Sequence, residues 1–167
     1  MKKILFFASL VLLLNSCSLS YKFNGASIDY DVTKTIFISE FPNQAPLVYP
    51  PLEQRFNEEL KDLFTRSTRL QFVRQNADLE MEGEIVGYEL TPLAVQEDSF
   101  ASETMLTLTV RMRYRNNKVM GQDKEETFKA SSNFPADRML TDVQDQLIAE
   151  LIKEIVDQMF NSTMSNW

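Results

Sequence analysis

The sequence predicts an α+β protein, a two-layer sandwich in which two helices pack on one face of a small, four- to five-stranded, mostly antiparallel sheet. Two segments, 52–67 and 141–160, repeat apolar residues at helical spacing. Three segments between them, 78–93, 103–116 and 124–134, have the composition and alternation of strands. Because helix 141–160 has a wide apolar face, it needs a sheet to cover it.

A proline-rich segment separates the first predicted strand from the first predicted helix. Residues 33–41 are rich in Thr, Ile and Phe and predict a strand. Prolines 50 and 51 suit the entry of a helix, since their fixed φ is tolerated in the first turn. The apolar positions of that helix are Leu52, Phe56, Leu60, Leu63 and Phe64.

A long antiparallel hairpin follows a short strand at 70–74. Strands 78–93 and 103–116 flank a polar segment, 96–102, which is typical of a hairpin loop. If both helices cover one face of the resulting sheet, the other face is open to water or to a partner.

The N-terminus has the features of a signal peptide. Lys2 and Lys3 precede an apolar run that is too short to span a bilayer, and the run ends in Leu14-Asn15-Ser16-Cys17. This ending resembles a bacterial lipobox, although Asn15 is more polar than usual. We therefore expect cleavage before Cys17 and lipidation of its sulfur, with acyl chains such as palmitate.

The expected organisation is a signal peptide at 1–16, a lipidated N-terminus and tether at 17–32, and a single domain at 33–167. Each buried CH₂ of an acyl chain contributes about 0.8 kcal/mol to membrane binding. The alternative is an ordinary secreted protein whose only cysteine happens to lie near its cleavage site.

Composition excludes several classes of function. The chain has 17 Lys and Arg against 24 Asp and Glu, and loss of Lys2 and Lys3 with the signal leaves 15 against 24, a net charge of −9. Such an acidic domain is a poor binder of nucleic acid. With no histidine and a single cysteine, the chain lacks His-based catalysis, and we expect no catalytic residues, metal site or cofactor.

The clearest candidate site is a row of arginines on strand 103–116. Arg111, Arg113 and Arg115 alternate with apolar residues, so they share the sheet face away from the helices, about 6.6 Å apart. Guanidinium groups in such a row suit lipid phosphates, sugar carboxylates or a partner. The alternative is a cross-strand charge ladder with Glu80, Glu82 and Glu84, in which a hairpin centred near residues 98–99 would pair Glu84 with Arg113 and Glu82 with Arg115.

Several segments resemble LptE family lipoproteins across essentially the whole mature chain: 24–28, 41–48, 79–88, Thr91-Pro92, Thr141-Asp142-Val143 and Asn166-Trp167. The resemblance implies a non-enzymatic outer-membrane lipoprotein that faces the periplasm, plugs the LptD barrel, assists its assembly and can contact lipopolysaccharide. It also implies two helices over a small mixed sheet.

An alternative function is a periplasmic lipoprotein adaptor for another envelope or transporter complex. A hydrolase is disfavoured because histidine and a free thiol are missing. After Cys17, the residues Ser18-Leu19-Ser20 carry no acidic inner-membrane retention signal, which favours the outer membrane.

Overall fold

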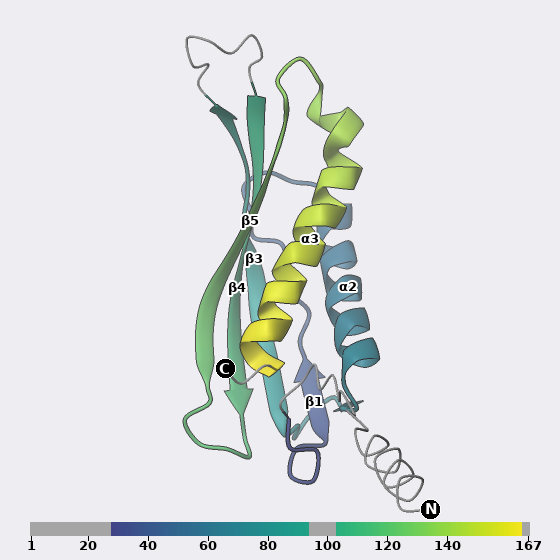
Figure 1. Ribbon diagram of the computed structural model, residues 1–167, viewed down its shortest axis with the longest axis vertical. Helices are drawn as coiled ribbons and strands as arrows, with labels where there is room; N and C mark the ends of the chain where they lie inside the picture. Colours follow the sequence, from purple (N-terminus) through teal and green to yellow (C-terminus); the bar gives the residue numbers. More distant parts are fainter. Residues whose placement is uncertain (1–27, 94–102, 165–167) are drawn as a thin grey trace, which may run out of the picture.

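The computed structural model describes residues 28–93 and 103–164 and shows two layers (Figure 1). Helices α2 (Pro51–Ser67) and α3 (Leu140–Met164) lie on one face of a five-stranded open sheet. The predicted α+β fold class is confirmed. The predicted signal peptide, Cys17, the tether before residue 28, the loop at 96–102 and the C-terminal Asn166-Trp167 lie outside the described residues.

The sheet is mixed, in the order β2-β1-β3-β4-β5. Its strands are β1 (Thr35–Ile38), β2 (Gln71–Phe72), β3 (Leu79–Leu93), β4 (Glu103–Asn116) and β5 (Lys124–Pro135). The three long strands are antiparallel, as expected, whereas β1 runs parallel to both β2 and β3. Helix α2 connects β1 to β2, and such a crossover returns the chain in the parallel direction.

Strand β1 is shorter than the predicted 33–41 because the chain leaves the sheet before Phe41. The side chain of Asn57 on α2 accepts a hydrogen bond from the Phe41 N–H at 2.9 Å and donates one to its carbonyl at 3.2 Å. Both backbone groups of Phe41 are thus satisfied by a helix side chain instead of a strand. Asn57 is 4% exposed, which makes it one of few buried polar residues of the described chain.

Helix α3 extends to Met164, four residues beyond the predicted end at 160. Its last turn, Asn-Ser-Thr-Met, contains weak helix formers, which is why the pattern alone ended the helix early. Packing overrides that preference, since Met164 is buried and the Thr163 hydroxyl donates to the Met159 carbonyl at 2.8 Å.

The hydrophobic core fills the space between the helices and the sheet. The Phe64 and Phe160 rings join the two helices in an edge-to-face contact with centroids 5.2 Å apart. Under α2, Phe41 lies directly over Gly83 of β3, where a Cβ would come within 2.2 Å of the Phe41 ring and 2.3 Å of the Arg111 carbonyl. Only glycine permits this close approach of the Phe41 ring and the β4 backbone to β3.

Candidate functional site

The arginine stripe, defined as Arg111, Arg113 and Arg115, lies on the sheet face opposite the helices. The intervening Val110, Met112 and Tyr114 are buried in the core, as the period of two predicted. The three arginine side chains are 54%, 59% and 50% exposed. The face they occupy is therefore open in this structure.

Each arginine has a carboxylate neighbour on an adjacent strand. Arg111 lies 3.2 Å from Glu84 and Arg115 lies 3.1 Å from Glu80, both across the β3–β4 pairing. The third ion pair joins Arg113 to Glu125 of β5 at 3.5 Å, although Glu82 is its register partner on β3. The charge ladder predicted from the alternation of glutamates and arginines is thus present.

The predicted pairing within this ladder was wrong by two residues. The register pairs are Glu80–Arg115, Glu82–Arg113 and Glu84–Arg111. Two causes add up to this difference. Leu93 pairs with Glu103, which centres the hairpin on residue 98 and moves the pairing by one residue from the predicted centre between 98 and 99. Val86 has no partner on β4, and this extra residue moves the pairing by one more. The irregularity lies between Ile85 and Gly87, and sequence alternation alone did not reveal it.

A shallow hollow of about 290 Å³ lies on this face beside the arginine stripe. Its lining comes from three long strands and the segment after β1: Pro42, Glu82, Gly83, Glu84, Arg111, Arg113 and Glu125. Gly83 contributes only backbone to this lining, because its Cβ position faces the Phe41 ring on the helix side of the sheet. The hollow can hold a small polar group between two guanidiniums and three carboxylates.

Electrostatically, the stripe is balanced by its neighbours. Three arginines face Glu80, Glu82, Glu84 and Glu125, so the local charge is close to neutral. Exposed pairs of this kind contribute about 0.2–1 kcal/mol each, so a stronger ligand can displace a carboxylate at small cost. Binding of a phosphate or carboxylate at the stripe therefore requires exchange with a paired glutamate.

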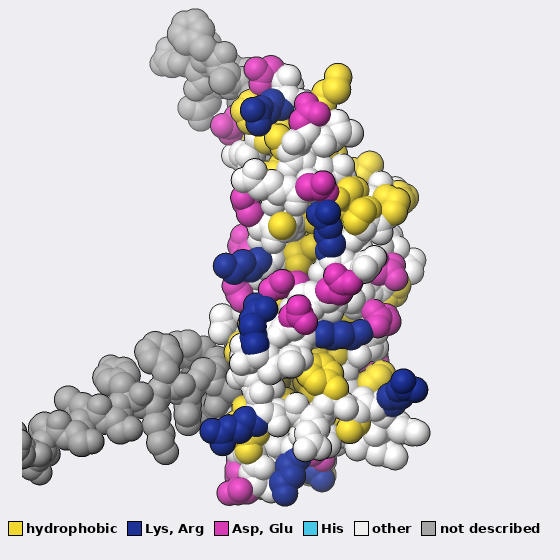
Figure 2. All heavy atoms as spheres, turned by 90° about the vertical axis from the view of Figure 1, so that its right-hand side faces the viewer, with side chains coloured by type: hydrophobic (Ala, Val, Ile, Leu, Met, Phe, Trp, Pro, Cys, Tyr) yellow, Lys and Arg dark blue, Asp and Glu magenta, His cyan; other side chains and the backbone are white. Residues whose placement is uncertain are grey.

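Figure 2 views the molecule from the side that carries the helices. Basic and acidic side chains are interspersed over it, and apolar side chains gather in its upper part. Near the start of α3, Asp145 accepts a hydrogen bond from Tyr49 and lies 3.1 Å from the Arg55 guanidinium of α2. The hydrogen bond with Asp145 raises the pKa of Tyr49. This cluster joins the two helices to the preceding loop, and no sequence motif predicted it.

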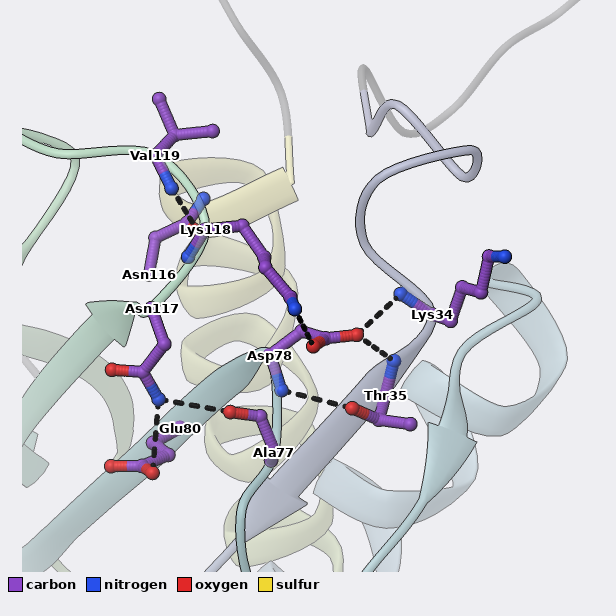
Figure 3. A network of polar contacts seen from close by, with 9 residues as sticks. All are labelled: Lys34, Thr35, Ala77, Asp78, Glu80, Asn116, Asn117, Lys118 and Val119. Carbon is purple, nitrogen blue, oxygen red and sulfur yellow. Dashed lines mark hydrogen bonds and ion pairs between the residues drawn. The ribbon is translucent and has the colours of Figure 1, made fainter.

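A second polar network, centred on Asp78, ties three segments together at the start of β3 (Figure 3). Its carboxylate accepts the backbone N–H groups of Lys34 and Thr35 at 2.8 and 3.0 Å, and lies 3.0 Å from the Lys118 ammonium. In return, the Asp78 N–H donates to the Thr35 hydroxyl at 2.9 Å. Burial raises the pKa of Asp78, but the Lys34 N–H, the Lys118 ammonium and the two contacts with Thr35 outweigh it and lower this pKa to about 2.

Within 28–93 and 103–164, no group of three or more Asp, Glu, His or Cys could hold a metal ion. No helix in these ranges is long and apolar enough to cross a membrane. Glu80, Glu82 and Glu84 of β3 lie in the charge ladder, and Glu82 and Glu84 also line the hollow.

Comparison with solved structures shows the same fold in several lipoproteins at low identity. A minor lipoprotein from Acinetobacter baumannii is 16% identical, with a TM-score of 0.50 over 78% of this chain and 91% of that one. Lipoprotein B from Nitrosomonas europaea is 15% identical, with a TM-score of 0.52 over 77% and 80%. Rare lipoprotein B from Shewanella oneidensis is 11% identical, with a TM-score of 0.55 over 75% and 92%. At these identities the likeness shows the fold alone.

No curated protein sequence matches this chain. The family model of LptE, described as lipopolysaccharide-assembly, matches residues 33–163. This match spans all five strands, α2 and all but the last residue of α3, and it includes the arginine stripe. The chain therefore belongs to the LptE family of lipopolysaccharide-assembly lipoproteins.

Proposed function

We propose that this chain is an outer-membrane lipoprotein subunit of the lipopolysaccharide translocon, where it plugs an LptD-like β-barrel and assists its assembly. The observation that carries the proposal is the LptE family match over residues 33–163. The chain acts as a structural and binding subunit, with no catalytic step, no cofactor and no nucleic-acid ligand.

The open sheet face is suited to the interior of a barrel. Apart from Pro135 at the end of β5, its exposed side chains on β4 and β5 are polar or charged, and include the arginine stripe, Lys129 and Asn133. The lumen of an outer-membrane barrel is polar and water-filled, in contrast to its lipid-facing surface. A polar plug surface keeps its hydrogen bonds with water or with lumen side chains when it enters such a space.

The arginine stripe is the proposed contact for lipopolysaccharide or for acidic groups of the barrel. Lipid A phosphates and core-sugar carboxylates are planar or tetrahedral anions that accept paired guanidinium hydrogen bonds. The half-exposed guanidiniums can reach such a group without any movement of the backbone. The glutamates hold the arginines in place until the anion replaces them.

Cys17 is the proposed membrane attachment. Cleavage before it and acylation of its sulfur would leave the domain on a tether of residues 18–32, on the periplasmic side of the outer membrane. The family match is consistent with an envelope lipoprotein.

An affinity pull-down tests the proposed partner. The tagged, lipidated protein is purified from outer membranes in mild detergent, and its partners are identified by mass. A large barrel protein in stoichiometric amount supports the translocon. Recovery with inner-membrane transporter subunits would instead indicate an adaptor of another envelope complex.

A triple substitution tests the stripe itself. Arg111→Ser, Arg113→Ser and Arg115→Ser together are expected to weaken lipopolysaccharide binding to the purified protein. The matched control removes three exposed, ion-paired cations from α2: Arg55→Ser, Lys61→Ser and Arg66→Ser. Equal binding by both variants and the original chain would reduce the stripe to a charge ladder.

A further inference from the structure

An apolar tip projects from the end of the molecule at which the described chain begins. The turn between β4 and β5 carries Val119, 41% exposed, and Met120, 100% exposed, and Val32 nearby is 48% exposed. Ile28, Val32 and Val119 line one concavity of about 170 Å³, which places the three residues at the same end. We call Val32, Val119 and Met120 the apolar tip.

The turn that presents Met120 is fixed by its own hydrogen bonds. The side-chain oxygen of Asn116 accepts the N–H groups of Lys118 at 2.9 Å and Val119 at 3.0 Å (Figure 3). Gly121 follows with a φ of 81°, a value that favours glycine. The methionine is therefore held outward by a structured turn, and no part of the described chain covers it.

The apolar tip lies at the end of the domain to which the expected lipid anchor is attached. Ile28, the first described residue, is eleven residues after Cys17, and a fully extended chain of that length reaches at most about 40 Å. The anchor thus keeps this end near the bilayer. A tether of that length does not itself orient the domain, so a second contact is needed to hold one end against the membrane.

The charges around the apolar tip indicate the kind of lipid surface. Lys118 is paired with Asp78 at 3.0 Å, so its charge is offset. Lys34 and Arg69, whose guanidinium lies 5.8 Å from the Tyr30 ring, are matched by Asp29, Asp31 and Asp123 in the neighbouring turns, which leaves no excess of positive charge. A surface of this composition suits a membrane of zwitterionic lipids better than a membrane of strongly anionic lipids. Its contact with the headgroup region is apolar and not electrostatic.

We propose that the apolar tip inserts into the headgroup region of the bilayer that holds the chain's own lipid anchor, so that the free lipoprotein stands on the membrane at this end. The inference rests on the proposed lipidation of Cys17. It adds an orientation and a second membrane contact, which an acyl anchor by itself does not give.

The test uses a single introduced thiol. Because Cys17 is the only cysteine and lipidation blocks its sulfur, Met120→Cys in the lipidated protein carries the only reactive thiol. An environment-sensitive fluorophore on it is measured in phosphatidylcholine vesicles with and without a spin-labelled quencher lipid. The matched control is Met139→Cys, because Met139 is also a largely exposed methionine, 73% exposed, at the opposite end of β5.

We expect a blue shift and several-fold stronger quenching at position 120 than at position 139, both unchanged in high salt. Equal signals at the two positions, or no signal at 120 in protein that floats with the vesicles, would overturn the inference while leaving the anchor intact. Loss of the signal in high salt would overturn insertion by apolar contact. Protein that stays off the vesicles and labels at two thiols would refute the anchor and the inference together.

Discussion

Replacing Asp78 with Asn is expected to destabilise the domain near neutral pH and to have little effect in strong acid. The carboxylate joins the start of β1 to the β4–β5 turn through Lys34, Thr35 and Lys118. Its side chain is only 15% exposed, so water replaces these contacts poorly. An amide keeps the shape of the carboxylate but loses its charge and one of its acceptor oxygens.

The pKa of Asp78 sets the size and the pH range of the effect. A fall from 3.8 to about 2 in the folded protein corresponds to about 2.4 kcal/mol of stabilisation by the charged form, or about 1–2 kcal/mol after allowance for solvent screening. Since the folded-state pKa is the lower one, this stabilisation is fully present above pH 3.8. It is lost as the pH falls through about 2.

Urea unfolding followed by circular dichroism measures this contribution. The difference in unfolding free energy between the original chain and Asp78→Asn should be about 1–2 kcal/mol at pH 6 and should shrink towards zero near pH 2. Asp145→Asn is the control, because Asp145 also has a lowered pKa but its side chain is 76% exposed. A difference for Asp78→Asn that is the same at both pH values would refute the assigned pKa and its cause.

Three further predictions concern the core and the anchor. Asn57→Ala leaves the buried N–H and carbonyl of Phe41 unpaired and should lower the unfolding free energy by about 2–4 kcal/mol. The control is Asn133→Ala, which removes a hydrogen bond at the surface, and an equal loss of unfolding free energy in the two variants would contradict the prediction. Gly83→Ala should cost more stability in urea than Gly87→Ala, since the nearest atoms to the added Cβ lie at 2.2 Å and 3.0 Å respectively. Cys17→Ser should abolish incorporation of labelled palmitate and release the protein from membranes, and retained label would place the lipid elsewhere.

The element types could be predicted because their patterns are local. The helix on 51–67 follows from prolines at its entry and apolar residues at helical spacing, and the long strands follow from alternation on β4. The burial of every second residue between 106 and 114 and the exposure of the arginine stripe follow from the same period.

The pairing of the elements depended on features that local patterns do not encode. The unpaired Val86 changes the register of β3 against β4, so it also changes which glutamate meets which arginine. The direction of β2 is set by the helix crossover, and the early end of β1 is set by Asn57 on a helix. Asp78 was predicted only as the first residue of strand 78–93, and its partners at Lys34 and Thr35 are more than 40 residues away in the sequence.

Depletion of the protein in its own bacterium tests the central claim most directly. Newly made lipopolysaccharide is pulse-labelled, and the fraction that reaches the cell surface is measured before and after depletion, with complementation by the original chain and by the stripe triple variant. The proposed role in the translocon predicts that surface delivery falls on depletion, returns with the original chain and returns only in part with the triple variant. Normal surface delivery in fully depleted cells would contradict a role in lipopolysaccharide assembly.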